Sequence, residues 1–92
     1  MCKFRVITET AIKLNRAALI GEMQILMWNE GREFSENTLN NVCDTIEEYL
    51  ADKTVDFKGY SITFLEKEIA KRGYDYLLGD KSVETYFTDL VK

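Results

Sequence analysis

The chain has 92 residues, a hydrophobic content of 46%, a charged content of 30% and a formal net charge of −4. This length is typical of one domain, so we expect residues 1–92 to form a single compact unit, and the composition excludes a disordered chain. The longest purely apolar runs, at 17–20 and 25–28, are far too short to span a membrane.

Acidic charge is concentrated in the middle of the chain. Residues 30–56 carry eight acidic and two basic side chains, whereas residues 1–29 carry two acidic and four basic ones. This distribution disfavours a globally basic nucleic-acid binder. The two cysteines, Cys2 and Cys43, are too few for a disulfide framework, and the N-terminus lacks the pattern of a secretory signal. We therefore expect an intracellular protein, located in the cytoplasm.

Residues 2–14 alternate in character, with apolar residues or Thr at the even positions and mostly charged residues at the odd ones. A period of two predicts one long half-buried strand, or two short strands broken near Glu9. A helical pattern that runs from Phe4 to Trp28 is the alternative. We favour the strand because the helical pattern has Ala and Gly at core positions and β-branched residues in its first turns.

The next segment predicts a helix at about 16–29, with Asn15 as its N-cap and Gly31 at its end. One side of this helix carries its main apolar stripe. The opposite side is also apolar and consists of Ala18, Gly21, Ile25 and Trp28. A helix that is apolar on two sides is buried on two sides.

The second apolar side of this helix is a candidate for self-association. Its two small residues allow another helix to approach closely, while Ile25 and Trp28 supply contact area. Either the last helix of the same chain covers this side, or it forms the contact of a homodimer or larger homo-oligomer.

A central helix begins after Ser35, which is a suitable N-cap. Its predicted apolar stripe consists of Leu39, Val42, Cys43, Ile46 and Leu50, and its opposite side carries Asn37, Asn41, Asp44, Glu48 and Asp52. Carboxylates near the end of a helix oppose its dipole. This acidic face is therefore either a solvated surface or a binding site for a basic partner, formed by Asp44, Glu47, Glu48 and Asp52.

Residues 54–64 alternate in two short runs, and the parity changes across Lys58-Gly59. That change is typical of a tight hairpin or of a bulge. A helix capped by Ser61 is the alternative, because Ile62 begins a pattern that also fits helical spacing.

The rest of the chain predicts a short helix at 65–72 closed by Gly73, and a last helix that begins after Ser82. These elements together predict an α+β fold. It has a small antiparallel-containing sheet, formed by residues 2–14 and 54–64, packed with about four helices. An all-α fold is the alternative.

Nothing in the sequence has the pattern of an active site. The chain has no His, which removes the commonest general base and metal ligand. It has no glycine loop of the kind that binds phosphate. Asp44 and Glu48 lie one helical turn apart, but acid–base chemistry by a carboxylate pair needs one of the two to be buried, and both lie on the polar face. We therefore expect no catalytic residue, no cofactor and no metal site.

The favoured function is that of a non-enzymatic protein-interaction protein. It self-associates, or it acts as a small acidic inhibitor whose acidic face imitates phosphate and occupies a basic, nucleic-acid-binding surface of a protein partner, or it does both. The alternative function is a nucleic-acid-binding module that uses exposed tyrosines and a basic N-terminal strand. The basic residues of that strand and just after it are Lys3, Arg5, Lys13 and Arg16. No motif in the chain is specific enough to name a family.

Overall fold

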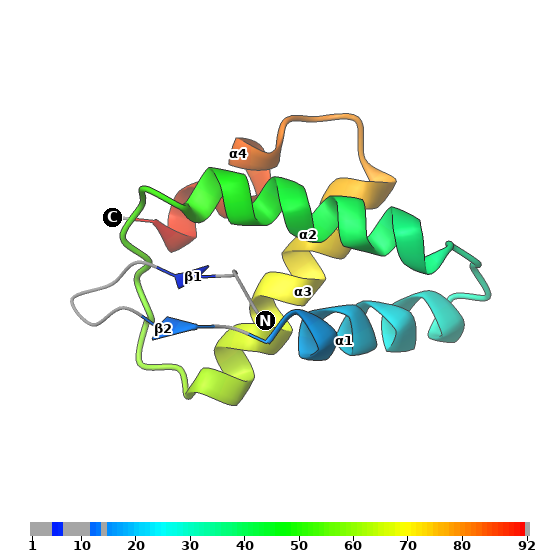
Figure 1. Cartoon of the computed structure of the whole chain (residues 1–92), viewed down its shortest axis with the longest axis horizontal. Coiled ribbons are helices and arrows are strands. Elements are labelled where there is room, and N and C mark those ends of the chain that lie inside the picture. The colour runs from blue at the N-terminus through cyan, green and yellow to red at the C-terminus, as the bar shows by residue number, and fades with distance from the viewer. Residues whose placement is uncertain (1–4, 7–11, 14, 92) are drawn as a thin grey trace.

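The computed structural model of the chain describes residues 5–6, 12–13 and 15–91 and is an all-helical fold. Its four helices are α1 (Arg16–Asn29), α2 (Glu36–Leu50), α3 (Ile62–Leu78) and α4 (Val83–Phe87), and the 3-10 turn η1 (Thr88–Leu90) follows α4. Figure 1 shows that α1 and α2 run antiparallel to each other and that α3 crosses them. The short helix α4 packs against α2 and α3.

Strands contribute only a short ladder to the described part of the chain. β1 (Arg5–Val6) pairs antiparallel with β2 (Ile12–Lys13), and one isolated bridge joins Val55 to Val91. Residues 54–64 contain no strand that could form a sheet with 2–14. The α+β prediction is therefore wrong, and the all-α alternative describes the fold. Most of the predicted strand at 2–14 lies outside the described residues.

The change of parity at Lys58-Gly59 marks a turn, but this turn does not join two strands. Lys58 and Gly59 both have positive φ, of 54° and 78°, and the N–H of Tyr60 donates to the carbonyl of Phe57 at 2.8 Å. Positive φ at both central residues is the geometry that tight hairpins use. Here the turn leads directly into Ser61, whose Oγ accepts the N–H of the residue three positions on, at 3.1 Å. That cap begins α3, so the second apparent strand is the first turn of a helix.

Gly73 lies inside α3 and does not end it, so the prediction of a short helix at 65–72 is also wrong. A Cβ atom at Gly73 would lie 2.7 Å from Cδ1 of Ile46 and 3.2 Å from Cγ1 of Val42, both on α2. The missing side chain therefore lets α3 cross α2 closely. A glycine required by a helix crossing has the same appearance in the sequence as a glycine that ends a helix.

The predicted ends of α1 and α2 are confirmed. Asn15 Oδ1 accepts the N–H of Ala17 at 2.9 Å, and Ser35 Oγ accepts the N–H of Thr38 at 3.1 Å. Gly31 follows α1 with a φ of 68°, a left-handed conformation that glycine adopts without strain. These caps fix where both helices start and where α1 stops.

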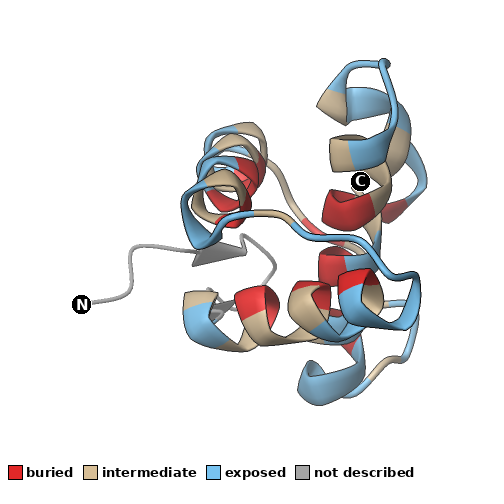
Figure 2. Ribbon diagram, turned by 90° about the vertical axis from the view of Figure 1, so that its right-hand side faces the viewer, coloured by how far each residue is buried: buried red, intermediate tan, exposed pale blue. Residues whose placement is uncertain are grey.

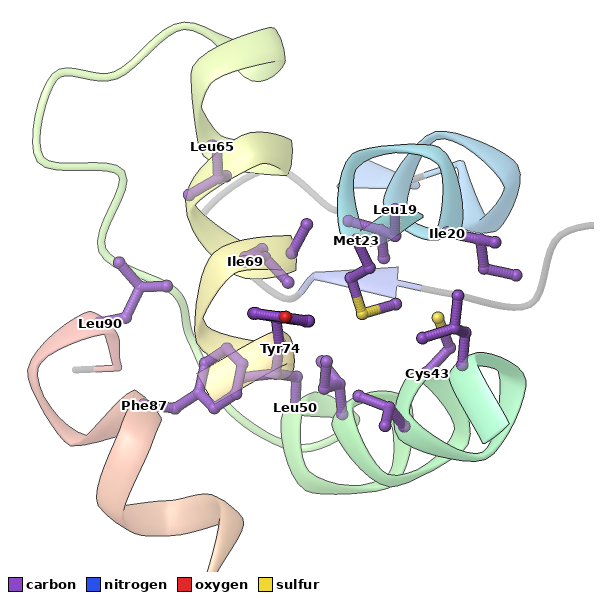
Figure 3. Packing of buried hydrophobic residues seen from close by; sticks show 14 of the residues in the cluster. Leu19, Ile20, Met23, Cys43, Leu50, Leu65, Ile69, Tyr74, Phe87 and Leu90 are labelled. Atoms are coloured by element: carbon purple, nitrogen blue, oxygen red, sulfur yellow. The ribbon is translucent and has the colours of Figure 1, made fainter. Parts of the chain in front are cut away.

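The core is one cluster to which all four α-helices and η1 contribute (Figure 3). The predicted apolar stripe of α2 is entirely buried. Phe87 of α4 and Leu90 of η1 are also fully buried. In Figure 2 the buried residues lie on the sides of the helices that face one another. Since each large buried side chain stabilises the fold by about 1.5–3 kcal/mol, this cluster determines which residues remain outside.

Candidate interaction surfaces

The outward side of α1 is apolar, although its inward side already belongs to the core. The inward side buries Leu19, Ile20, Met23 and Met27. On the outward side Ala18 and Gly21 are half-buried, while Ile25 is 50% and Trp28 62% exposed. Ala17 is exposed on the same side, a residue that the sequence reasoning did not include. We call the set Ala17, Ala18, Gly21, Ile25 and Trp28 the α1 outer face.

The last helix does not cover the α1 outer face. α4 packs against α2, α3 and η1, whereas among the described helices and strands α1 packs against α2 and α3. A Cβ atom placed at Gly21 would meet no atom within 4 Å. No described helix or strand therefore shields this face from water. Because Ile25 and Trp28 are adjacent on this face, they are a candidate for an interaction surface, whereas single exposed apolar residues are common on any protein.

The acidic residues of α2 are partly balanced within the chain. Asp44, Glu48 and Asp52 are exposed and Glu47 is half-buried, so the predicted acidic face does point outward. Arg16 of α1, however, places its Nη1 2.8 Å from Asp44 Oδ1 and its Nη2 3.0 Å from Glu47 Oε2. Two of the four acidic candidates thus share one cation.

The position of Arg16 explains how α2 tolerates two of its carboxylates. The last turn of α2 contains no basic residue, so the cation that balances Asp44 and Glu47 comes from α1. Its guanidinium lies along Asn40, Asp44 and Glu47 rather than at the end of the helix. Burial alone would lower the pKa of Arg16, but its hydrogen bonds to Asp44 and Glu47 outweigh burial and raise the pKa. The arginine therefore keeps its charge.

The other two acidic candidates remain outside this ion pair. Asp52 lies next to Lys53, with its Oδ1 3.2 Å from the lysine Nζ. Glu48 is exposed on the outward side of α2. The structure therefore groups Asp44 with Glu47 around Arg16 and leaves Glu48 and Asp52 apart from them.

A second ion cluster, which the sequence reasoning missed, holds the end of the chain. Arg72 of α3 donates from Nη1 to the carbonyl of Tyr86 at 3.0 Å, and from Nη2 to Asp89 and Glu68 at 3.2 Å each. The hydrogen bond from Arg72 lowers the pKa of Asp89. The spacing of Glu68 and Arg72 is the one signal in the sequence, because residues four apart on a helix are neighbours. The contacts with Tyr86 and Asp89 depend on tertiary packing.

A third polar cluster joins the end of α1 to α3. Glu30 Oε1 accepts hydrogen bonds from Arg32 Nε at 2.9 Å and from the Tyr74 hydroxyl at 2.8 Å. These two hydrogen bonds lower the pKa of Glu30, and the larger contribution comes from Arg32. This cluster fixes the C-terminal end of α1 beside α3, and so it helps to set the direction of the α1 outer face.

The features on which the nucleic-acid alternative depends are only partly present. Tyr74 is buried and the other four tyrosines are half-buried. The exposed aromatic residues of the described chain are Trp28 and Phe64. Arg16 is engaged with the acidic side chains of α2. Arg5 and Lys13 are opposite each other in the ladder, and Lys3 lies outside the described residues.

Comparison of the chain with protein-family models, with curated proteins and with solved structures finds no match. Within residues 5–6, 12–13 and 15–91, no three His, Cys, Asp or Glu side chains are grouped as metal ligands. The same residues include no helix with the length and apolar character that crossing a membrane requires.

Proposed function

We propose that this protein is a non-enzymatic interaction protein that self-associates through the α1 outer face. The observation that carries the proposal is the exposure of Trp28 and Ile25 on a helix whose opposite side is fully committed to the core. Tryptophan is enriched among the residues that dominate binding energy at protein interfaces. Each square ångström of apolar surface removed from water contributes about 25 cal/mol, so covering these two side chains favours association.

The same helix also makes close approach of a second molecule possible. Ala17, Ala18 and Gly21 have little or no side chain, and the space above Gly21 is open. Small residues at a helix contact bring the two backbones together and increase van der Waals contact. The α1 outer face therefore combines large anchors with a shallow surface to receive them.

The other two readings of the sequence have less support. Arg16 balances Asp44 and Glu47, which reduces the charge that an acidic inhibitor would present to a basic partner. The tyrosines are at least half-buried, which reduces the surface on which bases would stack. Self-association needs neither charge nor stacking. The proposal places the protein in the cytoplasm, where the free and buried thiol of Cys43 would stay reduced.

The proposal is tested by measuring molar mass against protein concentration with sedimentation equilibrium. We expect the unmodified protein to form dimers or larger species as its concentration rises from micromolar to millimolar. Gly21→Arg should yield monomers, because an arginine would project from the middle of the α1 outer face. It should leave the fold intact, since the space there is open. Asn41→Arg adds the same side chain to the exposed side of α2 and should not change the mass. An unmodified protein that stays monomeric over this range would refute the proposal.

A further inference from the structure

The α1 outer face is divided by size along the helix. Its N-terminal half holds the small residues Ala17, Ala18 and Gly21, and its C-terminal half holds the large residues Ile25 and Trp28. Between Ala17 and Asn29, Glu22 is the only charged residue. A helix turns by about 100° per residue, which puts Glu22 on the flank, roughly a quarter turn from the middle of the face.

The same geometry pairs the large residues with the small ones. Ala17 and Trp28 are eleven residues apart, which is three turns plus about 20°, so they lie on the same flank of the face. Ala18 and Ile25 are seven residues apart, which is two turns less about 20°, so they share the other flank. Gly21 lies between the two flanks and near the middle of the face along the helix.

We propose that a second copy of this chain binds the α1 outer face antiparallel, about a two-fold axis that passes beside Gly21. In such a pair each flank meets the same flank of the other copy, with the direction of the helix reversed. Trp28 then lies over Ala17 of the second copy, and Ile25 lies over Ala18 of the second copy. Each contact occurs twice, as two-fold symmetry requires. This arrangement rests on the proposed function and specifies its geometry.

In a parallel pair the large residues of one copy would not meet the small residues of the other. With the two helices in the same direction and at the same height, large residues meet large ones and small residues meet small ones. The helices would then be held apart at Trp28 and would leave a gap at Ala17. Voids and overcrowding both weaken a packed contact, so the antiparallel pair is favoured.

Charge limits where a second copy can bind. The protein has a net charge of −4, so two copies repel each other over most of their surface. Contact is least unfavourable where carboxylates are absent, and the α1 outer face itself carries none. Arg16, the one basic residue at this end of α1, is turned toward Asp44 and Glu47 of α2. A strongly charged partner would find no opposite charge on this face.

The expected contact is small and reversible. A tryptophan buries about 150–250 Å², so at 62% exposure Trp28 offers roughly 100–150 Å² on each copy. Ile25 is 50% exposed and the other members of the face are small, so the pair stays below the total of about 1,000 Å² that a stable specific interface buries. We therefore expect dissociation at micromolar or higher concentration.

The inference is tested with two variants that are complementary in shape. Ala17→Trp makes a copy with tryptophan at both 17 and 28, and Trp28→Ala makes a copy with alanine at both. In the antiparallel register, residue 28 of one copy meets residue 17 of the other. Two copies of Ala17→Trp would place tryptophan against tryptophan at both contacts and be overcrowded. Two copies of Trp28→Ala would place alanine against alanine and leave a gap at both. Mixed together, they place a tryptophan against an alanine at both contacts, as in the unmodified pair.

Native mass spectrometry and sedimentation of the mixture give the result. We expect the mixed dimer to dissociate at a concentration at least about tenfold lower than either variant alone, because both packed contacts are restored. Asn41→Trp, which adds the same side chain on α2, should give no preference for the mixed dimer with Trp28→Ala. Both substituted residues are exposed, so circular dichroism should show an unchanged fold; the smaller Ala17→Leu repeats the test with less bulk.

Self-association and the antiparallel register are refuted by different results. If the unmodified protein dimerises but the mixed dimer is no tighter than the variants alone, the antiparallel register is wrong and self-association stands. If the unmodified protein is monomeric throughout, the proposed function fails and the register fails with it. A preference for the mixed dimer supports both.

Discussion

Gly73→Ala has two opposite effects on stability: alanine favours the helix more than glycine does, but its methyl group would crowd the core. The structure predicts that the crowding is the larger effect. In the interior of a helix, glycine is less stable than alanine by about 0.5–1 kcal/mol. At Gly21 on α1 the added methyl group meets open space, so Gly21→Ala should raise the free energy of unfolding by about that amount. Gly21→Ala is therefore the matched control for the same substitution at Gly73.

At Gly73 the new methyl group meets the core. It would lie 2.7 Å from Cδ1 of Ile46, a side chain with no exposed surface, and 3.2 Å from Cγ1 of Val42. Carbon atoms prefer separations of about 3.5–4.0 Å, so Ile46 must move by roughly 1 Å. Inserting a methyl group into a packed core typically costs about 1–3 kcal/mol. Gly73→Ala should therefore lower the free energy of unfolding by up to about 2 kcal/mol despite its better propensity.

A double-mutant cycle isolates the clash. Ile46→Val removes Cδ1, the nearest atom, and alone should lower the free energy of unfolding by about 0.5–1.5 kcal/mol. Combined with Gly73→Ala, it vacates space for the new methyl group. The double variant should therefore be more stable than the sum of the single effects predicts, by about 1 kcal/mol.

Urea unfolding followed by far-ultraviolet circular dichroism measures these differences. Helical signal is preferable to fluorescence, because Trp28 is already 62% exposed in the folded protein. All variants are compared at one protein concentration low enough for each to be monomeric, because self-association would shift the midpoint and Gly21 lies on the α1 outer face. Equal stabilisation by Gly73→Ala and Gly21→Ala, with an additive cycle at 46 and 73, would show that α3 does not cross α2 at this glycine.

Three further outcomes follow from the polar and buried groups. Burial raises the pKa of Cys43 to about 11, so in a Cys2→Ser variant the native thiol should react with a thiol reagent at pH 8 roughly two orders of magnitude more slowly than the unfolded chain. The pKa of Asp89 is lowered, mainly by its hydrogen bond with Arg72. Its contribution to stability is thus present above the unfolded value of about 4 and lost below it, and Asp89→Asn should flatten thermal stability between about pH 5 and pH 2. Asp44→Lys puts a second cation beside Arg16 and should lower the free energy of unfolding by about 0.5–1 kcal/mol, measured by urea unfolding, because the Asp44 side chain is 59% exposed.

Much of α1 and α2 could be predicted because local chemistry decides it. Asn15 and Ser35 cap their helices through contacts only two or three residues long, and Gly31 supplies a conformation that other residues avoid. The buried stripe of α2 repeats at helical spacing, so the side that faces the core follows from the sequence. The outward position of the acidic residues follows in turn.

The course of α3 could not be predicted in the same way, because its signals are ambiguous until tertiary contacts are known. Ser61 follows a turn with the geometry of a hairpin, and Gly73 resembles a helix end. The role of Gly73 is decided by the close approach of α2, because Ile46 of α2 fills the space that a side chain at position 73 would need. The role of Arg16 is hidden for the same reason, because its partner Glu47 is 31 residues away.

The effect of salt on self-association shows whether the α1 outer face or the acidic side of α2 forms the contact. Contact between an acidic face and a basic partner weakens as salt rises, since exposed charges are screened over about 10 Å at 0.1 M ionic strength. The α1 outer face has no charged member, and the copies that meet there carry the same net charge. Screening should therefore leave the dimer unchanged or strengthen it slightly, because it reduces the repulsion between the two molecules. Sedimentation at about 0.05 M and 0.5 M salt measures this directly, with Glu48→Lys as a variant that changes the acidic face and leaves α1 intact. A dimer that dissociates as salt is added, or that Glu48→Lys disrupts, would transfer the interaction from α1 to the acidic side of α2.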